Sequence, residues 1–206
     1  METIFLHAYE NNAWAGRQSR SGTGSEFEQT RTLIAELPNL FRSLGIRSLL
    51  DIPCGDFHWM KQVDLSGIDY IGADIVAPII EHNRDIQRVP NVSFRTLDLT
   101  SDSLPKVDLI LCRDCLVHLS NHDIFRALRN IKASGSTYLL ATTFVGRVNN
   151  FDCKTGSWRV LNLEKAPFLF PSPLCLVTEK CTENGGIYAD KSLALWRVND
   201  IAPAIP

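Results

Sequence analysis

Short apolar runs alternate with segments of helical periodicity along most of the chain. The first four of these runs are bounded by turn residues, as expected for strands buried on both faces of a parallel sheet. Because strand and helix alternate, we expect right-handed crossovers and a doubly wound, Rossmann-like α/β fold with helices on both faces. The predicted strands are Ser48–Ile52, Tyr70–Asp74, Val92–Leu97, Val107–Cys112 and Thr137–Phe144, followed by an antiparallel edge pair, Leu174–Thr178 and Ser192–Val198.

The segment before the first strand carries helix signals. Ser25 and Glu28 match a capping box, and apolar residues follow at helical spacing. Pro38 then interrupts the pattern, which resumes until Gly45. We therefore expect a capped helix that is interrupted at Pro38 and ends at Gly45.

Two later helices are predicted by residues at their ends. Pro78 suits the first turn of a helix, and Pro90 ends that stretch. Ser120 and Asp123 cap another helix, with apolar residues along one face. We expect these apolar faces to pack in the core.

The chain has 206 residues, which corresponds to a single domain over residues 1–206. We expect residues 1–45 to form an arm and helices over the functional site. Residues 145–173 contain glycines and prolines without a clear period, and an irregular segment of this length is uncommon unless it is a lid or a binding loop. We therefore expect residues 145–173 to be a substrate lid.

Composition excludes several classes of protein. Hydrophobic residues make up 45% and charged residues 21%, which is ordinary for a globular protein, and the net charge of −2 argues against a large nucleic-acid interface. No apolar run approaches the ~20 residues of a membrane span, and the first residues lack the basic region of a signal peptide. The six cysteines then indicate reduced thiols, and we expect a cytoplasmic protein.

Cys112, Cys115 and His118 form a C-x2-C-x2-H string that could bind zinc. However, Cys112 ends a strand-like run, and no second pair of ligands lies at zinc-site spacing. We therefore expect no metal site.

The candidate chemistry lies where three predicted strands end. Asp51 ends the first strand and Gly55 follows in a tight turn, while Asp74 ends the second strand. Ligands of open α/β sheets bind outside the carboxyl ends of the strands, and an acid at the tip of the second strand can accept hydrogen bonds from ribose hydroxyls. Asp98, after the third strand, could hold an adenine amine. The alternatives are that Asp74 caps a helix and Asp98 only stabilises a turn.

The loop after the first strand distinguishes between nucleosides. A dinucleotide site requires G-x-G-x-x-G, but only Gly55 is present here. The Asp56 carboxylate would repel a pyrophosphate and attract the ammonium group of a methionine moiety, although Asp56 could also cap a helix. The Y-x-x-x-K pair of short-chain dehydrogenases is absent as well. These residues point to S-adenosylmethionine.

The chain resembles the class I SAM-dependent methyltransferases over about Ser48 to Phe144, and the resemblance extends to the terminal strand pair. It is carried by Asp51-Ile-Pro-Cys-Gly-Asp56, Tyr70-Ile-Gly-Ala-Asp74, Asp98-Leu99 and Asp108-Leu-Ile-Leu-Cys-Arg-Asp-Cys-Leu-Val-His118. The resemblance implies a seven-stranded sheet of order 3-2-1-4-5-7-6, and Pro53-Cys54 depart from the usual glycine or alanine. The residues expected to contact the cofactor are Asp51, Pro53, Cys54, Gly55, Asp56, Trp59, Asp74, Ile75, Asp98, Leu99 and Arg113.

More narrowly, the whole chain is similar to short bacterial methyltransferases whose substrates are unassigned. The similar stretches are Trp14-Ala-Gly-Arg17, Ser21-Gly-Thr-Gly-Ser-Glu26, Arg147 with Thr155-Gly-Ser-Trp-Arg-Val-Leu-Asn-Leu163, and Lys191-Ser-Leu-Ala-Leu-Trp196. This similarity implies no particular acceptor.

Asp114 and His118 are the candidate catalytic residues. They follow the fourth strand at a spacing of four residues, which a helical turn places on one face. Methyl transfer needs an aligned nucleophile and, for a hydroxyl or ammonium group, a base, and histidine suits that role near neutral pH. The alternative is that His118 only caps or packs under the following helix.

The candidate substrate-binding residues lie in the N-terminal arm and in the irregular segment. Arginines with an aromatic and an amide group suit an acidic or polyhydroxylated small molecule, although scattered surface residues would give the same pattern. The glycine-rich stretch of the arm could cradle a carboxylate or serve only as a flexible leader. The candidates are Trp14, Arg17, Arg147, Asn150, Trp158 and Arg159.

We therefore expect a methyltransferase that moves a methyl group from S-adenosylmethionine to an oxygen or nitrogen atom of a small polar metabolite. Two alternatives remain open. A nucleic-acid or protein methyltransferase would need a docking surface, and the Asn-Pro-Pro-Tyr signature of many base methylases is missing. A non-catalytic SAM-binding regulator would keep Asp51 and Asp74 without needing a base. The sequence does not predict an oligomeric state.

Overall fold

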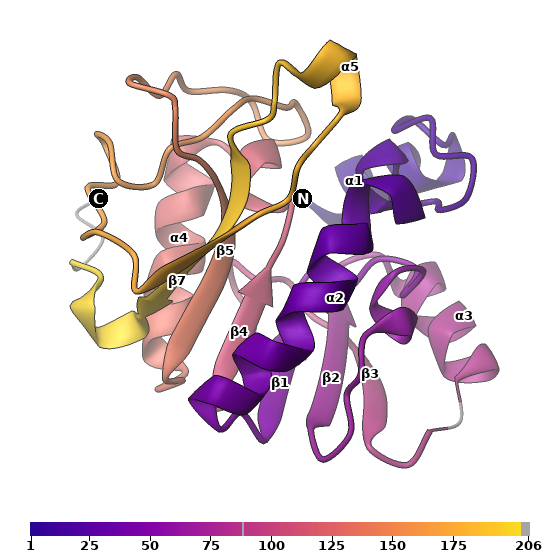
Figure 1. Ribbon diagram of the computed structural model, residues 1–206. Helices are drawn as coiled ribbons and strands as arrows, with labels where there is room; N and C mark the ends of the chain where they lie inside the picture. The colour runs from indigo at the N-terminus through magenta and orange to yellow at the C-terminus, as the bar shows by residue number, and fades with distance from the viewer. Residues whose placement is uncertain (88, 203–206) are drawn as a thin grey trace.

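Seven strands form one sheet in the computed structural model, which describes residues 1–87 and 89–202 (Figure 1). The strand order is β3-β2-β1-β4-β5-β7-β6, and β7 runs antiparallel to both β5 and β6 while the other pairs are parallel. The predicted fold is confirmed, with strand limits shifted by one or two residues. The strands are β1 Ser48–Asp51, β2 Asp69–Asp74, β3 Val92–Thr96, β4 Leu109–Cys112, β5 Tyr138–Phe144, β6 Cys175–Thr178 and β7 Lys191–Arg197.

Helices cover both faces of the sheet. On one face, α2 (Phe27–Leu44) and α3 (Ala77–Ile86) pack in a core cluster with one set of strand residues, and on the other, α4 (Asn121–Ala133) packs in a second cluster (Figure 1). This division follows from the pleat, because successive side chains of a strand point to opposite faces. The remaining helical segments are short: α1 Glu2–Glu10, α5 Glu183–Gly186 and the 3-10 turns Thr23–Ser25, Met60–Gln62, Leu116–His118 and Val198–Asp200.

Helix α2 differs from its prediction in two ways. Glu26 is its N-cap and makes no side-chain capping bond, because Ser25 lies in the preceding 3-10 turn; the predicted capping box is therefore wrong. The helix also runs through Pro38 without interruption. An internal proline costs roughly 3 kcal/mol, and burial of Leu33, Leu37 and Phe41 against the sheet offsets this cost.

The other helix ends follow the sequence more closely. Gly45 ends α2 in the left-handed conformation, with φ at 65°, and the Ser120 side chain accepts the Asp123 backbone N–H at the start of α4. Pro78 lies in the first turn of α3, but that helix ends at Ile86, before Pro90. Local capping chemistry therefore decided two of these ends, and α3 ends earlier than its proline indicates.

Residues 145–173 contain no helix or strand, as predicted, and six residues of the segment are buried. Leu161 and Leu163 are fully buried in the α4-side core, and the Phe144 backbone N–H donates to the Leu161 carbonyl at 2.8 Å. Part of the segment therefore belongs to the core, while most of its residues lie at the surface. The last four residues of the predicted domain lie outside the described range.

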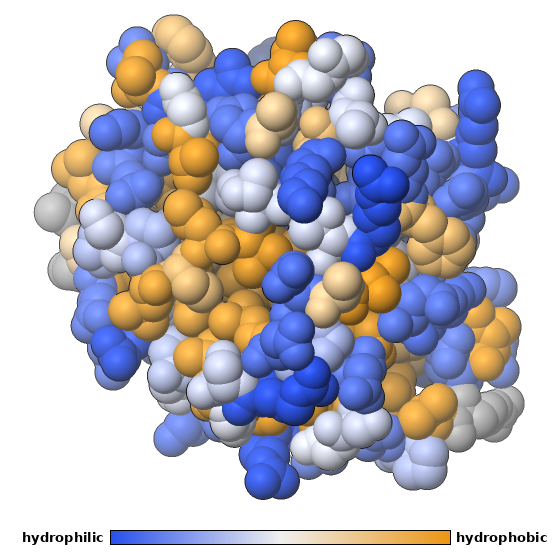
Figure 2. All heavy atoms as spheres, in the orientation of Figure 1, coloured by the Kyte–Doolittle hydropathy of each residue, from blue (hydrophilic) through white to orange (hydrophobic). Residues whose placement is uncertain are grey.

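The surface gives two further observations. Apolar side chains gather in the left half of the view in Figure 2, around the edge strand β6, where Leu174 and Leu176 are exposed. Among the residues that the structure describes, no helix is long and apolar enough to cross a membrane.

Candidate functional site

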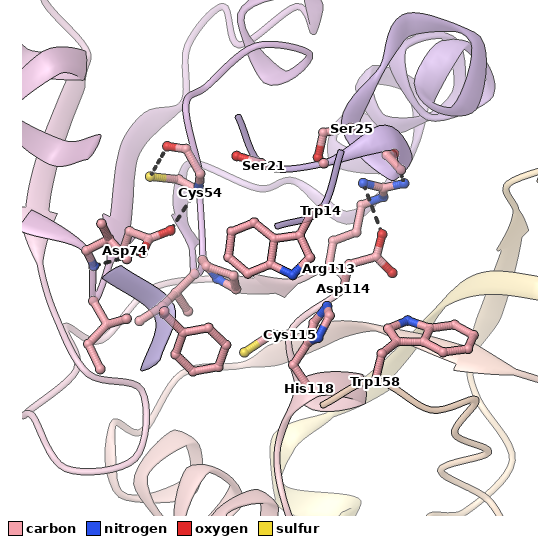
Figure 3. A pocket seen from close by; sticks show the side chains of 18 of the residues that line it. Trp14, Ser21, Ser25, Cys54, Asp74, Arg113, Asp114, Cys115, His118 and Trp158 are labelled. Carbon is pink, nitrogen blue, oxygen red and sulfur yellow. Dashed lines mark hydrogen bonds and ion pairs between the residues drawn. The ribbon is translucent and has the colours of Figure 1, made fainter. Parts of the chain in front are cut away.

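A cavity of about 400 Å³ opens at the carboxyl ends of β1 to β4 (Figure 3). Its walls come from the loops after these strands, from the N-terminal arm (residues 1–26), and from residues at the start of β7 and before it. The structure thereby brings together fourteen of the residues predicted from sequence: Trp14, Asp51, Pro53, Cys54, Gly55, Trp59, Asp74, Ile75, Asp98, Leu99, Arg113, Asp114, His118 and Trp158.

Asp51 is buried at the end of the central strand β1, which lies between β2 and β4. Its carboxylate accepts a hydrogen bond from the Tyr70 hydroxyl at 2.6 Å. Burial raises the pKa of Asp51 to about 7, and the Tyr70 hydrogen bond and the Arg113 charge offset only part of this effect. The carboxyl group therefore favours a ligand that supplies hydrogen-bond donors or positive charge.

Asp74 ends β2 beside Asp51 and organises the loop around Gly55. Its carboxylate accepts hydrogen bonds from the backbone N–H groups of Gly55 at 3.2 Å and Val76 at 2.9 Å. Burial raises the pKa of Asp74 to about 6 even though these bonds lower it. Asn83, buried on α3, donates to the Gly55 carbonyl at 2.8 Å, a contact that sequence reasoning missed. The first two strand tips thus present two buried carboxyl groups to one cavity.

Gly55 is required where it lies. Its φ is +53°, a region that side chains rarely adopt, and a Cβ atom there would collide with the Ser21 side chain of the N-terminal arm. The arm therefore lies directly over the loop after β1.

Asp56, which was predicted to bind the cofactor, is not among the residues that line the cavity. Its carboxylate accepts hydrogen bonds from Ser19 Oγ at 2.9 Å, from the Arg20 backbone N–H at 2.8 Å and from Ser21 Oγ at 3.3 Å. These donors come from the arm, more than thirty residues away in sequence, so Asp56 fastens the arm to the sheet. The local pattern gave no sign of this partner.

Asp98 lies in a turn after β3, and stabilising a turn was the alternative role proposed for it from the sequence. Its Oδ1 accepts hydrogen bonds from the Thr100 backbone N–H at 2.8 Å and from Thr100 Oγ1 at 2.7 Å. Asp98, Leu99 and Thr100 all line the cavity as well. The turn role and a ligand-binding role are therefore compatible.

Four charged side chains form a buried cluster beside the cavity, and sequence reasoning identified only two of them. Arg113 Nη2 lies 2.7 Å from Glu179 Oε2, and Lys191 Nζ lies 2.6 Å from Asp114 Oδ2 and 3.5 Å from Glu179 Oε2. Arg113 also donates to the Gly24 carbonyl of the arm at 2.8 Å and lies over the Trp59 ring. A lysine at the first position of a mainly apolar strand was the available signal for this cluster.

The cluster makes Asp114 a weak base. Burial alone would raise the pKa of Asp114, but the charges of Lys191 and Arg113 outweigh it and hold the pKa at about 2. Asp114 also adopts a left-handed backbone conformation, with φ at 50°, and its N–H donates to Thr142 Oγ1 at 2.8 Å. Its ionised carboxylate is therefore held in one position.

His118, unlike Asp114, is held as a neutral side chain that can accept a proton. Its Nδ1 lies 2.9 Å from the Ser157 carbonyl oxygen, and because a carbonyl only accepts, Nδ1 carries the proton. Burial lowers the pKa of His118 below its ordinary value, an effect that the Ser157 hydrogen bond and the nearby Asp114 charge only partly oppose. The neutral ring then has Nε2 as an acceptor, the arrangement of a general base (Figure 3).

Aromatic rings line the same part of the cavity. Phe144, Trp158 and Tyr188 meet edge to face, with centroids 5.0 to 6.2 Å apart, and we call these three side chains the aromatic wall. Trp14 lies against His118 at 6.1 Å, also edge to face. Sequence reasoning missed Phe144 and Tyr188, because one belongs to a core strand pattern and the other to a loop.

The remaining predicted substrate residues do not line the cavity. Arg147 pairs with Asp190 at 3.0 Å, and Asn150 braces its own segment by donating to the Asn162 and Ala166 carbonyls. The Arg159 guanidinium donates to the Val117 carbonyl, and the Arg17 backbone N–H donates to Glu26. The contacts of Arg147, Asn150 and Arg159 show that these side chains hold the fold together.

Cys112, Cys115 and His118 make up the string that resembles a zinc site. In the part of the chain that the structure describes, no group of three or more histidine, cysteine or acidic side chains is placed to hold a metal ion. A side-chain hydrogen bond with Cys112, together with burial, raises the pKa of the Cys115 thiol.

Comparisons with known proteins bear on the fold. No protein-family model and no curated protein matches the sequence. Among solved structures, the PH0226 protein of Pyrococcus horikoshii aligns with a TM-score of 0.57 and 16% identity, over 81% of this chain and 90% of that one.

Two further structures are methyltransferases by name. Human N-acetylserotonin methyltransferase, in complex with SAM, aligns with a TM-score of 0.55 and 13% identity, over 93% of this chain and 65% of that one. Magnesium protoporphyrin IX methyltransferase of Synechocystis, with bound SAH, aligns with a TM-score of 0.53 and 14% identity, over 69% of this chain and 72% of that one. The present chain therefore spans about two thirds of the human enzyme. Together with the strand order, these likenesses show that the chain has the class I SAM-dependent methyltransferase fold.

Proposed function

We propose that this protein transfers a methyl group from S-adenosylmethionine to an oxygen or nitrogen atom of a small molecule. The observation that carries the proposal is a single cavity in which two buried carboxyl groups, Asp51 and Asp74, lie at one end and the His118 base at the other. The two carboxyl groups suit a cationic nucleoside. The His118 end of the cavity suits an acceptor that must lose a proton.

The residues fit this cofactor. Asp74, at the tip of β2, would accept hydrogen bonds from the ribose hydroxyls, and Asp51 would favour the cationic methionine end. Asp98 and Leu99 would hold the adenine, with the Gly55 loop against the ribose and methionine. When bound, S-adenosylmethionine supplies an electrophilic methyl group on a sulfonium centre.

The chain's own contribution to the reaction is orientation and proton transfer. His118, neutral and held by Ser157, would take the acceptor's proton at Nε2. Asp114, tied to Lys191, would stabilise the charged imidazole and position it rather than act as a base itself. The N-terminal arm, fastened by Asp56, would exclude water from the cavity.

A small acceptor fits better than a macromolecule. A cavity of about 400 Å³ is typical of small-molecule sites, and it lies beneath the arm rather than on an open basic face. The arginines of the irregular segment that could have contacted a phosphate backbone are paired within the protein. A non-catalytic regulator would have no use for a His118 that is held as a neutral acceptor.

The test is calorimetric titration of the protein with S-adenosylmethionine, S-adenosylhomocysteine and NAD. We expect micromolar binding of both adenosyl ligands and none of NAD. The Asp74→Ala variant should weaken binding at least tenfold, whereas Asp69→Ala, at the exposed opposite end of the same strand, should leave it unchanged. Binding of NAD alone, or equal effects of both substitutions, would overturn the proposal.

A further inference from the structure

The aromatic wall is a preformed surface for a flat ligand. Its three rings hold one another by edge-to-face contacts, with Trp158 and Tyr188 only 5.0 Å apart, yet the Trp158 side chain remains 44% exposed. A ligand can bury the exposed face of an aromatic ring that lines a cavity. Stacked or edge-to-face ring pairs are also more favourable than the buried area alone would give. The wall is therefore suited to a planar, apolar group.

Two carboxylates near the wall are already engaged in contacts within the protein. Asp114 is bonded to Lys191, and Glu183, which also lines the cavity, accepts from Thr23 Oγ1 at 2.6 Å. A sugar needs several unoccupied partners for its hydroxyl groups, because each buried hydroxyl without a hydrogen bond is costly. Because both carboxylates are engaged and the wall presents ring surface, a planar apolar group fits this part of the cavity better than a polyhydroxylated one.

The local charge also excludes an anionic acceptor. Arg113 and Lys191 are balanced by Asp114 and Glu179, and the Glu183 carboxylate adds a negative charge at the cavity. Arg147 and Arg159, which the sequence suggested as partners for an acid, are engaged in contacts within the protein. A carboxylate placed here would meet unopposed negative charge.

We propose, resting on the methyltransferase function above, that the acceptor is a neutral aromatic ring bearing a hydroxyl group. The ring lies against the aromatic wall, and the hydroxyl faces His118. Histidine suits such a group because a phenolic proton, with an ordinary pKa of about 10, is far easier to remove than that of an aliphatic alcohol.

The step balances as follows. The acceptor oxygen forms a bond to the methyl carbon while the carbon–sulfur bond breaks and leaves its electron pair on sulfur, which neutralises the sulfonium. The hydroxyl proton passes to Nε2 of His118 and then to solvent. The products are an aryl methyl ether and S-adenosylhomocysteine, and no oxidant, reductant or metal ion takes part.

The first experiment compares acceptors that differ in one group. Para-cresol, para-toluidine, para-toluic acid and para-methylcyclohexanol share a ring size and a methyl group, and β-naphthol and methyl glucoside extend the set. We expect methyl ethers, identified by mass spectrometry, from para-cresol or β-naphthol and no product from the acid, the saturated alcohol or the glucoside.

A second readout does not depend on turnover. Binding of β-naphthol to protein loaded with S-adenosylhomocysteine is followed by broadening of the naphthol proton resonances. Trp158→Leu should raise the dissociation constant about tenfold, since it removes a ring contact while keeping an apolar side chain. Phe151→Leu is the matched control, because Phe151 is exposed on the same segment but lies outside the cavity, and it should leave binding unchanged. His118→Asn should keep naphthol binding and lower methylation by about 100-fold or more.

The outcomes separate the two proposals. Failure to bind S-adenosylmethionine removes the methyltransferase proposal and this inference with it. If the cofactor binds but only the amine, the acid, the saturated alcohol or the glucoside is methylated, the methyltransferase stands and the aromatic-hydroxyl acceptor is overturned. If the cofactor binds but the hydroxylated rings are neither bound nor methylated, the aromatic-hydroxyl acceptor is overturned as well.

Discussion

The Lys191 ammonium group on β7 lies 2.6 Å from a carboxylate oxygen of Asp114, in the loop after β4. The sheet order places β5 between these two strands, so the pair spans the part of the site where the parallel strands meet the antiparallel one. Glu179 and Arg113 extend the cluster, and Arg113 connects it to the Gly24 carbonyl of the arm. The cluster thus joins the strand ends to the segment that covers the cavity.

Removing the Lys191 charge should destabilise the protein. In Lys191→Met the partly buried Asp114 keeps only its longer contact to Arg113, and breaking a buried pair by deleting one partner typically costs about 3 to 5 kcal/mol. We expect a loss of about 3 kcal/mol in the free energy of unfolding, measured by urea denaturation. Lys61→Met, at an exposed site, should change it by less than about 0.5 kcal/mol.

A double substitution tests whether the loss comes from the unpaired carboxylate. Adding Asp114→Asn to Lys191→Met removes that charge, so part of the stability should return, and the two effects should not add. Additive losses would mean that the two side chains stabilise the fold independently.

Asp51 and Asp74 should make the protein less stable as the pH rises. Their pKa values, about 7 and about 6, are raised above the ordinary value, so the folded state binds protons more tightly than the unfolded state. Their contribution is complete below about pH 4 and is lost as the pH rises through 6 to 7. Asp51→Asn, which keeps an acceptor for Tyr70, should therefore raise the free energy of unfolding at pH 7.5 by about 2 kcal/mol while weakening cofactor binding.

The measurement is urea denaturation at several values between about pH 5 and pH 7.5. The difference between wild type and Asp51→Asn should grow with pH, and Asp69→Asn, an exposed acid on β2, should show no such trend. A difference that is constant with pH would contradict the raised pKa of Asp51.

Cofactor binding should release protons. A cationic, hydroxyl-rich ligand stabilises the ionised forms of Asp51 and Asp74 and so lowers their pKa values from about 7 and about 6. Near pH 6.5 the calorimetric enthalpy should differ between phosphate and Tris buffers, whose ionisation enthalpies differ, and near pH 8.5 it should not. Equal enthalpies in both buffers at pH 6.5 would mean that neither carboxyl group meets the ligand.

The arm should loosen when Asp56 is replaced. Asp56→Ala removes the acceptor for Ser19, Arg20 and Ser21, so amide hydrogen exchange in residues 17–25 should become faster. Dissociation of S-adenosylhomocysteine should quicken by about tenfold, because each lost hydrogen bond to a charged group is worth about 1.5 to 3 kcal/mol. Asp69→Ala serves as the control, and unchanged exchange in the arm would show that other contacts hold it closed.

Part of the candidate site was predictable because it follows the strands. Apolar runs buried on both faces locate the parallel strands, and an acid that ends such a run must lie at the carboxyl edge, where Asp51 and Asp74 are found. His118 was predictable for the same reason, since it comes shortly after β4. These inferences need only the order of elements along the chain.

The sequence by itself therefore determined the architecture, the position of the two acids and the place of the histidine, because period and chain order encode them locally. The tertiary structure alone decided that Asp56 holds the arm, that Lys191 restrains Asp114, and that Arg147 and Arg159 serve the fold rather than the cavity. Each of these roles depends on a partner in another segment of the chain. Since a charged side chain pairs with whatever the folded chain brings within a few ångströms, no local pattern can name that partner.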